Sequence, residues 1–340
     1  MALPLLSSSY LPLIEAELRR AVGDGPEALR DYFVMMRYHL GWVDEAGQAS
    51  PNGSIGKRIR PLLCLLACAA SGGEPGRALP MAAAIELLHN FSLLHDDIQD
   101  NSPLRRGRPT VWQRWGVAQA INAGDAMFTL AHLAPHRLAE RGVAPEVALA
   151  ALAEFDRTCL ALTQGQFLDM RFEGCERVTV DEYLRMIRGK TAVLIAACTK
   201  LGALLAGASA ERQHHFEQFG LNLGLAFQVH DDWLGIWGDP AATGKSAASD
   251  LEQRKKSLPV VYGMERSPEF AARYARPHAP GEPVAGLAAQ LDALGARAYT
   301  VQAAQSLTDE ATAHLRAAAP AGPAAEALWE LTGSLLKRNA

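Results

Sequence analysis

Two clusters of aspartates are the feature of the sequence best suited to chemistry. Asp96, Asp97 and Asp100 end the stretch IELLHNFSLLHDDIQD, and Asp231 and Asp232 lie in GLAFQVHDDWLGIWGD. On a helix, Asp96 and Asp100 share one face, where carboxylates roughly 5–6 Å apart repel by about 3 kcal/mol at an effective dielectric near 20. Each cluster follows an apolar helical segment, which indicates a buried helix end. A buried helix end would not carry this repulsion unless a bound cation offset it. Carboxylates suit Mg²⁺, which keeps waters and shares its coordination shell with substrate phosphates.

Basic residues lie close to both clusters in the chain. One group is Lys57-Arg58-Ile59-Arg60, another is Arg105-Arg106-Gly107-Arg108, and three further lysines are Lys190, Lys245 and Lys255. Arginine forks and lysine charges bind phosphate groups. Two acidic clusters with metals could grip one diphosphate, neutralise it and make it a leaving group. A solvated surface is the ordinary explanation of each basic group alone, but not of several that flank acidic helices.

Length and composition limit the remaining possibilities. The 340 residues include 33 Lys plus Arg and 37 Asp plus Glu, a formal net charge of −4. This mild charge creates no global field for nucleic acid or an anionic membrane, so we expect no nucleic-acid partner. The five cysteines show no CxxC pair, and Cys64 and Cys68 are expected to be small buried hydrophobic residues. No apolar run is long enough for a membrane span, and we expect a cytoplasmic protein.

The hydrophobic pattern predicts an all-α protein, with residues 1–340 in a single domain. We expect no strand. A capping box, Thr179 to Glu182, should begin the helix that reaches Lys190 and Thr191. The other expected helices cover residues 9–46 with a break near 23–26, 62–70, 85–100, 116–170 with breaks at Gly124 and near 141–145, and a segment that stops at Trp237.

From about Gly56 to Pro259 the chain resembles the trans-isoprenyl diphosphate synthases of the polyprenyl synthetase family. Several family motifs occur in the family's order. They are GKRxRP at Gly56 to Pro61, DDxxD at Asp96 to Asp100, RRG at Arg105 to Gly107, GQxxD at Gly165 to Asp169, KT at Lys190-Thr191, FQxxDD at Phe227 to Asp232, and later Gly244-Lys245, Asp250, Lys255 and Leu258-Pro259. So many motifs in order make chance an insufficient explanation.

The resemblance implies an isoprenoid synthase-type helical bundle around a central substrate cavity, and it implies a role for each motif. Mg²⁺, about three ions per active site, would be held by Asp96, Asp100 and Asp231, with Asp97 and Asp232 in support. The allylic diphosphate would contact Arg105, Lys190, Thr191, Gln228, Lys245 and Lys255. The diphosphate of isopentenyl diphosphate would contact Lys57, Arg60, His89 and Arg106. A satisfied core histidine is the alternative for His89, although seven residues before Asp96 it falls on the same helical face. A homodimer is also expected.

The implied reaction is ionisation of the allylic diphosphate followed by attack of the isopentenyl double bond, which needs no side-chain nucleophile. Product length would depend on Phe91 and Ser92, five and four residues before Asp96. The small Ser92 and the lack of an insertion in DDIQD resemble members that make the C20 product, with C15 next. Gly235 stands where many members have a third aspartate. We therefore expect Gly235→Asp to have a mild effect.

Two other functions remain open at this stage. A class I terpene cyclase has the same fold and metal chemistry but needs one diphosphate site, so the retained Lys57, Arg60 and Arg106 favour chain elongation. A regulatory subunit of a heteromeric synthase would be expected to lose DDxxD, which this chain keeps.

Overall fold

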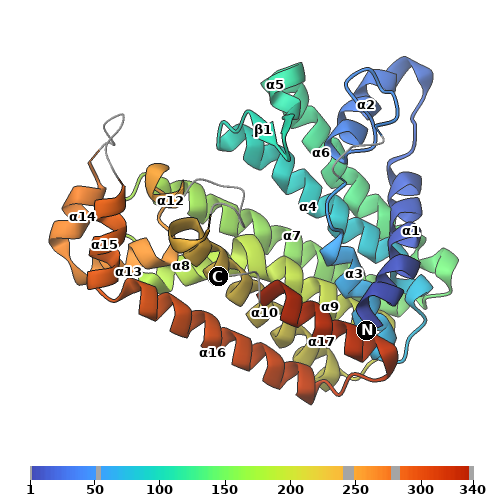
Figure 1. Cartoon of the computed structure of the whole chain (residues 1–340). Helices are drawn as coiled ribbons and strands as arrows, with labels where there is room; N and C mark the ends of the chain where they lie inside the picture. Colours follow the sequence, from blue (N-terminus) through green and yellow to red (C-terminus); the bar gives the residue numbers. More distant parts are fainter. Residues whose placement is uncertain (1, 51–54, 240–248, 277–283, 337–340) are drawn as a thin grey trace. The chain divides into compact units, whose positions relative to one another are not determined.

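The computed structural model describes residues 2–50, 55–239, 249–276 and 284–336, and these ranges are mostly helical (Figure 1). In chain order the elements are α1 (Ala2–Val22), η1 (Glu27–Leu29), α2 (Arg30–His39), α3 (Ile59–Ala70), η2 (Pro75–Ala78), α4 (Leu79–Gln99), β1 (Leu104–Arg105), β2 (Arg108–Pro109), α5 (Val111–Trp115), α6 (Val117–Leu133), η3 (Ala134–Arg141), α7 (Pro145–Glu173), α8 (Val180–Ile187), η4 (Arg188–Ala192), α9 (Val193–Leu205), α10 (Ala210–Trp237), α12 (Ser249–Glu252), α13 (Leu258–Arg266), α14 (Pro268–Tyr274), α15 (Ala285–Ala293), α16 (Ala296–Ala317) and α17 (Gly322–Leu336).

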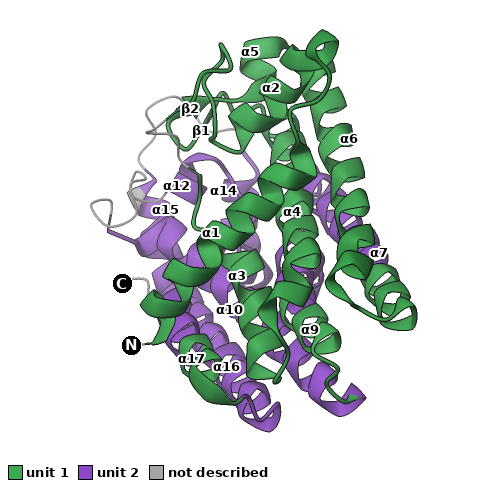
Figure 2. Ribbon diagram, turned by 90° about the vertical axis from the view of Figure 1, so that its right-hand side faces the viewer, with its two compact units in different colours: residues 1–154, 198–209, 321–328 green, residues 155–197, 210–320, 329–340 purple. Residues whose placement is uncertain are grey.

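The contacts divide the chain into two compact units (Figure 2), and the first contains residues 1–154, 198–209 and 321–328. Helix α4 lies at its centre, packed against α1, α3 and α6. Its buried residues lie on all sides of the helix and include Met81, Ile85 and Leu88, as expected of a helix inside a core. The last turn of this helix carries the first aspartate cluster.

The second unit contains residues 155–197, 210–320 and 329–340. Here α10 packs along α16 and against η4, a π-helical segment. The middle of α10 is buried, and Leu221, Leu225 and Val229 join a core that also includes Tyr183 of α8 and Val261 of α13. This packing fixes the face of α10 on which the second aspartate cluster lies.

The structure confirms several predictions about local structure. Thr179 and Glu182 form the capping box: the Glu182 backbone N–H donates to the Thr179 hydroxyl at 3.2 Å, and the Thr179 backbone N–H donates to the Glu182 carboxylate at 2.9 Å. The break between α1 and α2 and the end of α10 at Trp237 also agree with the sequence. Cys64 and Cys68 are buried free thiols. In the described part of the chain, no helix combines the length and apolar character that a membrane span requires.

Two predictions were wrong. Residues Leu104–Arg105 and Arg108–Pro109 pair as short antiparallel strands, in a segment where no strand was expected. The helix expected to break at Gly124 instead runs through it as part of α6. A Cβ at Gly124 would lie 2.3 Å from Nε2 of His95 in α4. The glycine therefore permits close packing of two helices and does not end one.

Candidate active site

The first aspartate cluster lies at the C-terminal end of α4, with Asp100 as the capping residue. Asp97 is buried, and the Nε atom of Arg105 donates to its Oδ1 at 2.8 Å. Burial raises the pKa of Asp97 to about 6, although Arg105 lowers it. Asp96 is half-buried and Asp100 is exposed. The carbonyl groups that end a helix carry partial negative charge, so this end attracts a cation even without the carboxylates.

Neighbouring residues of the basic loop before α3 have different roles. Arg58 is buried with a left-handed backbone (φ 47°), and it forms ion pairs with Glu86 at 2.8 Å and Glu15 at 3.1 Å. Lys57, the residue before it, is exposed. An arginine rarely adopts a positive φ without compensation, which the buried pair with Glu86 and the partly buried pair with Glu15 provide here. Arg58 thus anchors the loop, and Lys57 remains at the surface.

Arg60 and His89 lie together, as the resemblance implies. Nη1 of Arg60 is 3.2 Å from Nε2 of His89. Burial, together with Arg60, Arg106 and Arg105, holds the pKa of His89 well below its ordinary value. Because an arginine can only donate, Nε2 of His89 accepts the hydrogen bond and Nδ1 carries the proton. His89 is therefore a neutral residue within a group of cations.

The segment 104–109 is a β-hairpin whose two-residue turn is Arg106-Gly107, with φ values of 52° and 75°. A type I′ turn requires two such positive values. The guanidinium of Arg106 lies against Gly56, where a Cβ would be 3.0 Å from Nη2. Burial and the neighbouring Arg58, Arg105 and Arg60 lower the pKa of Arg106. Clustered positive charges of this kind favour binding of an anion.

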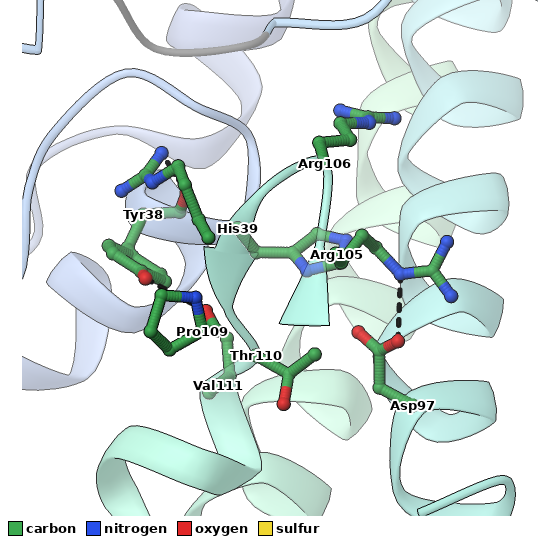
Figure 3. A pocket seen from close by; sticks show the side chains of 9 residues that line it. Tyr38, His39, Asp97, Arg105, Arg106, Pro109, Thr110 and Val111 are labelled. Carbon is green, nitrogen blue, oxygen red and sulfur yellow. Dashed lines mark hydrogen bonds and ion pairs between the residues drawn. The ribbon is translucent and has the colours of Figure 1, made fainter. Parts of the chain in front are cut away.

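Figure 3 shows a pocket in the first unit, lined by His39 of α2, Asp97 of α4 and residues of the hairpin. Sequence reasoning did not select His39. Burial and four nearby arginines lower its pKa to about 3, so it is neutral at pH 7. The sequence around His39, which lies directly before Leu40-Gly41 at the end of a helix, does not indicate that arginines from distant parts of the chain surround it. The pocket thus has an uncharged imidazole among guanidinium groups.

In the second unit, Asp232 and Asp231 have different surroundings. Asp232 is buried and accepts hydrogen bonds from the Tyr183 hydroxyl, from Nε2 of Gln228 at 3.1 Å and from the Leu258 backbone N–H at 3.0 Å. Burial raises the pKa of Asp232 to about 7, although these three donors lower it. Asp231 is half-buried. Tyr183 is a further residue that sequence reasoning missed, because it lies 49 residues before Asp232.

The π-helical segment carries Lys190 and Thr191. Nζ of Lys190 lies 2.5 Å from Oδ2 of Asp169, and Oγ1 of Thr191 donates to Oε1 of Gln228 at 3.1 Å. A Cβ at Gly165 would lie 2.1 Å from the backbone nitrogen of Lys190, so the glycine of GQxxD lets the π-helical segment approach α7 closely. π-Helical turns occur frequently at functional sites. The structure therefore brings Lys190, Thr191 and Gln228 together.

The structure changes the interpretation of Gly235. A Cβ at this position would lie 2.3 Å from Oδ2 and 2.5 Å from Cγ of Asp250, a buried residue of α12. The carboxylate of Asp250 thus occupies the space that a side chain at position 235 would need, so Gly235→Asp is now expected to be destabilising. Lys255 is exposed, and its backbone N–H donates to the Asp250 carbonyl at 2.9 Å. Lys245 lies outside the described residues.

The donors at both clusters fit Mg²⁺, because carboxylate oxygens are its preferred protein ligands. Among the described residues, no group of three or more His, Cys, Asp or Glu side chains is arranged to hold a metal ion. Mg²⁺ is commonly bound through one or two carboxylates and completes its shell with water and substrate phosphate. Asp96 and Asp100 in one unit, and Asp231 in the other, are partly accessible and could serve in this way.

Comparison with known proteins identifies the family. The family model described as polyprenyl synthetase matches residues 42–279. The chain belongs to the polyprenyl synthetase family. It is 46% identical over 287 residues to a geranylgeranyl diphosphate synthase of Mycobacterium tuberculosis, covering 81% of this chain and 80% of the relative. It is 40% identical over 321 residues to a (2E,6E)-farnesyl diphosphate synthase of Mycobacterium bovis, covering 90% and 86%.

A solved relative supports the same conclusion for the fold. It is the geranylgeranyl pyrophosphate synthase of Corynebacterium glutamicum, complexed with isoprenyl diphosphate and magnesium, which matches with a TM-score of 0.79 at 26% identity. The match covers 99% of each chain. The all-α prediction and the assignment to this synthase family are thereby confirmed. The chain is an isoprenyl diphosphate synthase, a prenyltransferase of the polyprenyl synthetase family.

Proposed function

We propose that this synthase condenses isopentenyl diphosphate with an allylic diphosphate and releases geranylgeranyl diphosphate, with farnesyl diphosphate as the next choice. Relatives of both names match most of the chain, which supports these two products over others. The observation that carries the proposal is the cluster that Arg60 and Arg106 form with His89 of α4. A cyclase has no need of this second anion site. A regulatory subunit has no need of Asp96 and Asp100.

The proposed assignment gives each substrate its own residues. Lys57, Arg60, His89 and Arg106 bind the diphosphate of isopentenyl diphosphate. The allylic diphosphate is bound by Arg105, Lys190, Thr191, Gln228, Lys245 and Lys255. Bound Mg²⁺, about three ions held by Asp96, Asp100 and Asp231, would neutralise the allylic diphosphate and make it a better leaving group.

The side chains of the chain then orient the reactants. Asp97 fixes Arg105 through the 2.8 Å ion pair, and Asp232 holds Gln228, which in turn accepts from Thr191. The allylic C–O bond breaks with its electron pair on the diphosphate. The double bond of isopentenyl diphosphate attacks the resulting carbocation, and the condensed product loses a proton to the released diphosphate. Each assigned side chain binds or orients, and none becomes covalently attached.

The central experiment is incubation with isopentenyl diphosphate, each short allylic diphosphate in turn and Mg²⁺, with the products separated by length. A C20 or C15 product that requires both substrates supports elongation. A cyclised hydrocarbon from the allylic substrate alone would instead identify a cyclase, and no turnover with any substrate would favour a regulatory subunit. Addition of EDTA should abolish product formation.

Three broader features are also part of the proposal. Residues 1–340 form a single domain, which is supported by three of the boundaries between the two units, since these fall inside the continuous helices α7, α9 and α17. The protein is a homodimer, which is supported by exposed apolar side chains along α6, at Val117, Ile121 and Leu133. Light scattering at several concentrations tests the dimer, and a monomer throughout would contradict it. The cytoplasmic location stays a prediction.

A further inference from the structure

The hairpin that carries Arg105 and Arg106 is too small to order itself. Each strand has two residues, and the turn places Arg106 at φ 52°. An isolated two-stranded hairpin is marginally stable in water, and a left-handed arginine makes it less stable. One anchor is the ion pair of Arg105 with Asp97, which fixes the first strand to α4. The second strand must be held by contacts of another kind.

Arg108 makes those contacts with the end of α2 and the loop after it. Its Nη2 donates to the Val43 carbonyl at 2.8 Å and its Nη1 to the Tyr38 carbonyl at 3.4 Å. Its Cζ lies 3.9 Å from the centre of the Tyr38 ring. The Tyr38 hydroxyl donates to the Pro109 carbonyl at 2.8 Å, so the two segments hold each other reciprocally. Figure 3 shows Tyr38 and Pro109 side by side in this region.

The three arginines of the hairpin therefore have different roles. Arg105 is tied to α4, and Arg108 is tied to the end of α2. Arg106, at the turn between them, lies against Gly56 of the other basic loop. Fixing both strands fixes the direction in which the turn presents Arg106. An arginine can stack and fork at the same time, whereas a lysine can supply only the charge.

We propose that Arg108 is a positioning residue, which orders the hairpin so that Arg106 meets the diphosphate of isopentenyl diphosphate without a further ordering cost. The inference rests on the proposed function, which assigns that diphosphate to Arg106. It predicts that loss of the Arg108 contacts weakens binding of one substrate, because a disordered hairpin must be ordered each time the substrate binds.

The test compares Arg108→Met and Arg108→Lys with Arg114→Met. Arg114→Met is a matched control, because it also removes one positive charge. The ion pair that Arg114 forms with Glu45, at 3.2 Å, lies at the surface. The KM for isopentenyl diphosphate should rise about tenfold in Arg108→Met with kcat changed less than threefold, the pattern of lost uniform binding. Arg108→Lys should fall between Arg108→Met and the wild type, and Arg114→Met should match the wild type.

A second readout needs no turnover: calorimetric binding of inorganic pyrophosphate, which should weaken in Arg108→Met and not in Arg114→Met. Equal KM and equal pyrophosphate affinity in Arg108→Met and Arg114→Met would overturn the inference. Inactive wild-type protein with the same loss of pyrophosphate affinity would overturn the proposed function and leave the role of Arg108 supported. If Arg108→Met does not fold, Tyr38→Phe replaces it, because this variant loses only the hydroxyl contact to Pro109. It should show the same pattern with a smaller change. Unchanged KM and pyrophosphate affinity in Tyr38→Phe would then overturn the inference.

Discussion

Replacing Gly235 with alanine should destabilise the protein, although the same change in most helices stabilises. In a helix interior, glycine is less favourable than alanine by about 1 kcal/mol. The added Cβ would lie 2.3 Å from Oδ2 and 2.5 Å from Cγ of Asp250, well inside the roughly 3.5–4.0 Å at which such atoms pack. Overpacking of this kind costs about 1–3 kcal/mol. Subtracting the propensity gain of about 1 kcal/mol leaves a net loss of up to about 2 kcal/mol.

Gly235→Asp should be more destabilising than Gly235→Ala in protein without Mg²⁺. It introduces the same clash and adds a second carboxylate beside that of Asp250. Two such charges about 4 Å apart repel by about 4 kcal/mol at an effective dielectric of 20. This expectation reverses the mild effect predicted from the sequence, because position 235 is filled by a carboxylate from another helix.

Urea unfolding gives the measurement, with Gly333→Ala as the matched control. Gly333 lies in α17 with no heavy atom within 4 Å of the position its Cβ would take. Gly333→Ala should therefore stabilise by about 1 kcal/mol. The double variant Gly235→Ala with Asp250→Ala should recover part of the loss, as expected for residues in contact. A Gly235→Ala protein that gains stability as Gly333→Ala does would refute the reasoning.

Three further predictions concern the metal, the product and pH. Asp96→Ala or Asp231→Ala should each lose most activity without loss of unfolding free energy, since a metal ligand is removed and repulsion is relieved; activity near that of the wild type would refute the metal assignment. Phe91→Ala should lengthen the product and Ser92→Phe shorten it in chromatographic analysis, while unchanged lengths in active variants would place the stop on another helix. His39 has a pKa of about 3 in the folded protein, so unfolded chains bind a proton that folded chains do not, and stability should fall by about 1.4 kcal/mol per pH unit between about pH 6 and pH 4. His39→Asn should remove that part of the slope in urea titrations, and an unchanged slope would contradict the account.

The sequence predicted those parts of the site that depend on spacing along one helix. Asp96 and His89 are an example, since both lie on α4, two turns apart. The sequence could not predict contacts between residues far apart in the chain. Tyr183 with Asp232 is such a contact, and Asp250 against Gly235 is another. A glycine in a helix permits a break or a close approach, and only the packed neighbour shows which one applies.

The two aspartate pairs show how one helical geometry produces two roles. Successive residues on an α-helix point about 100° apart, so adjacent carboxylates cannot both face the same ligand. In each pair the second aspartate is buried and bonded to protein, Asp97 to Arg105 and Asp232 to Tyr183, Gln228 and the Leu258 N–H. The first aspartate, Asp96 or Asp231, stays partly accessible. A doubled aspartate in this fold therefore leaves one carboxylate accessible, which we propose binds an external cation, and buries the other, which holds neighbouring side chains in place.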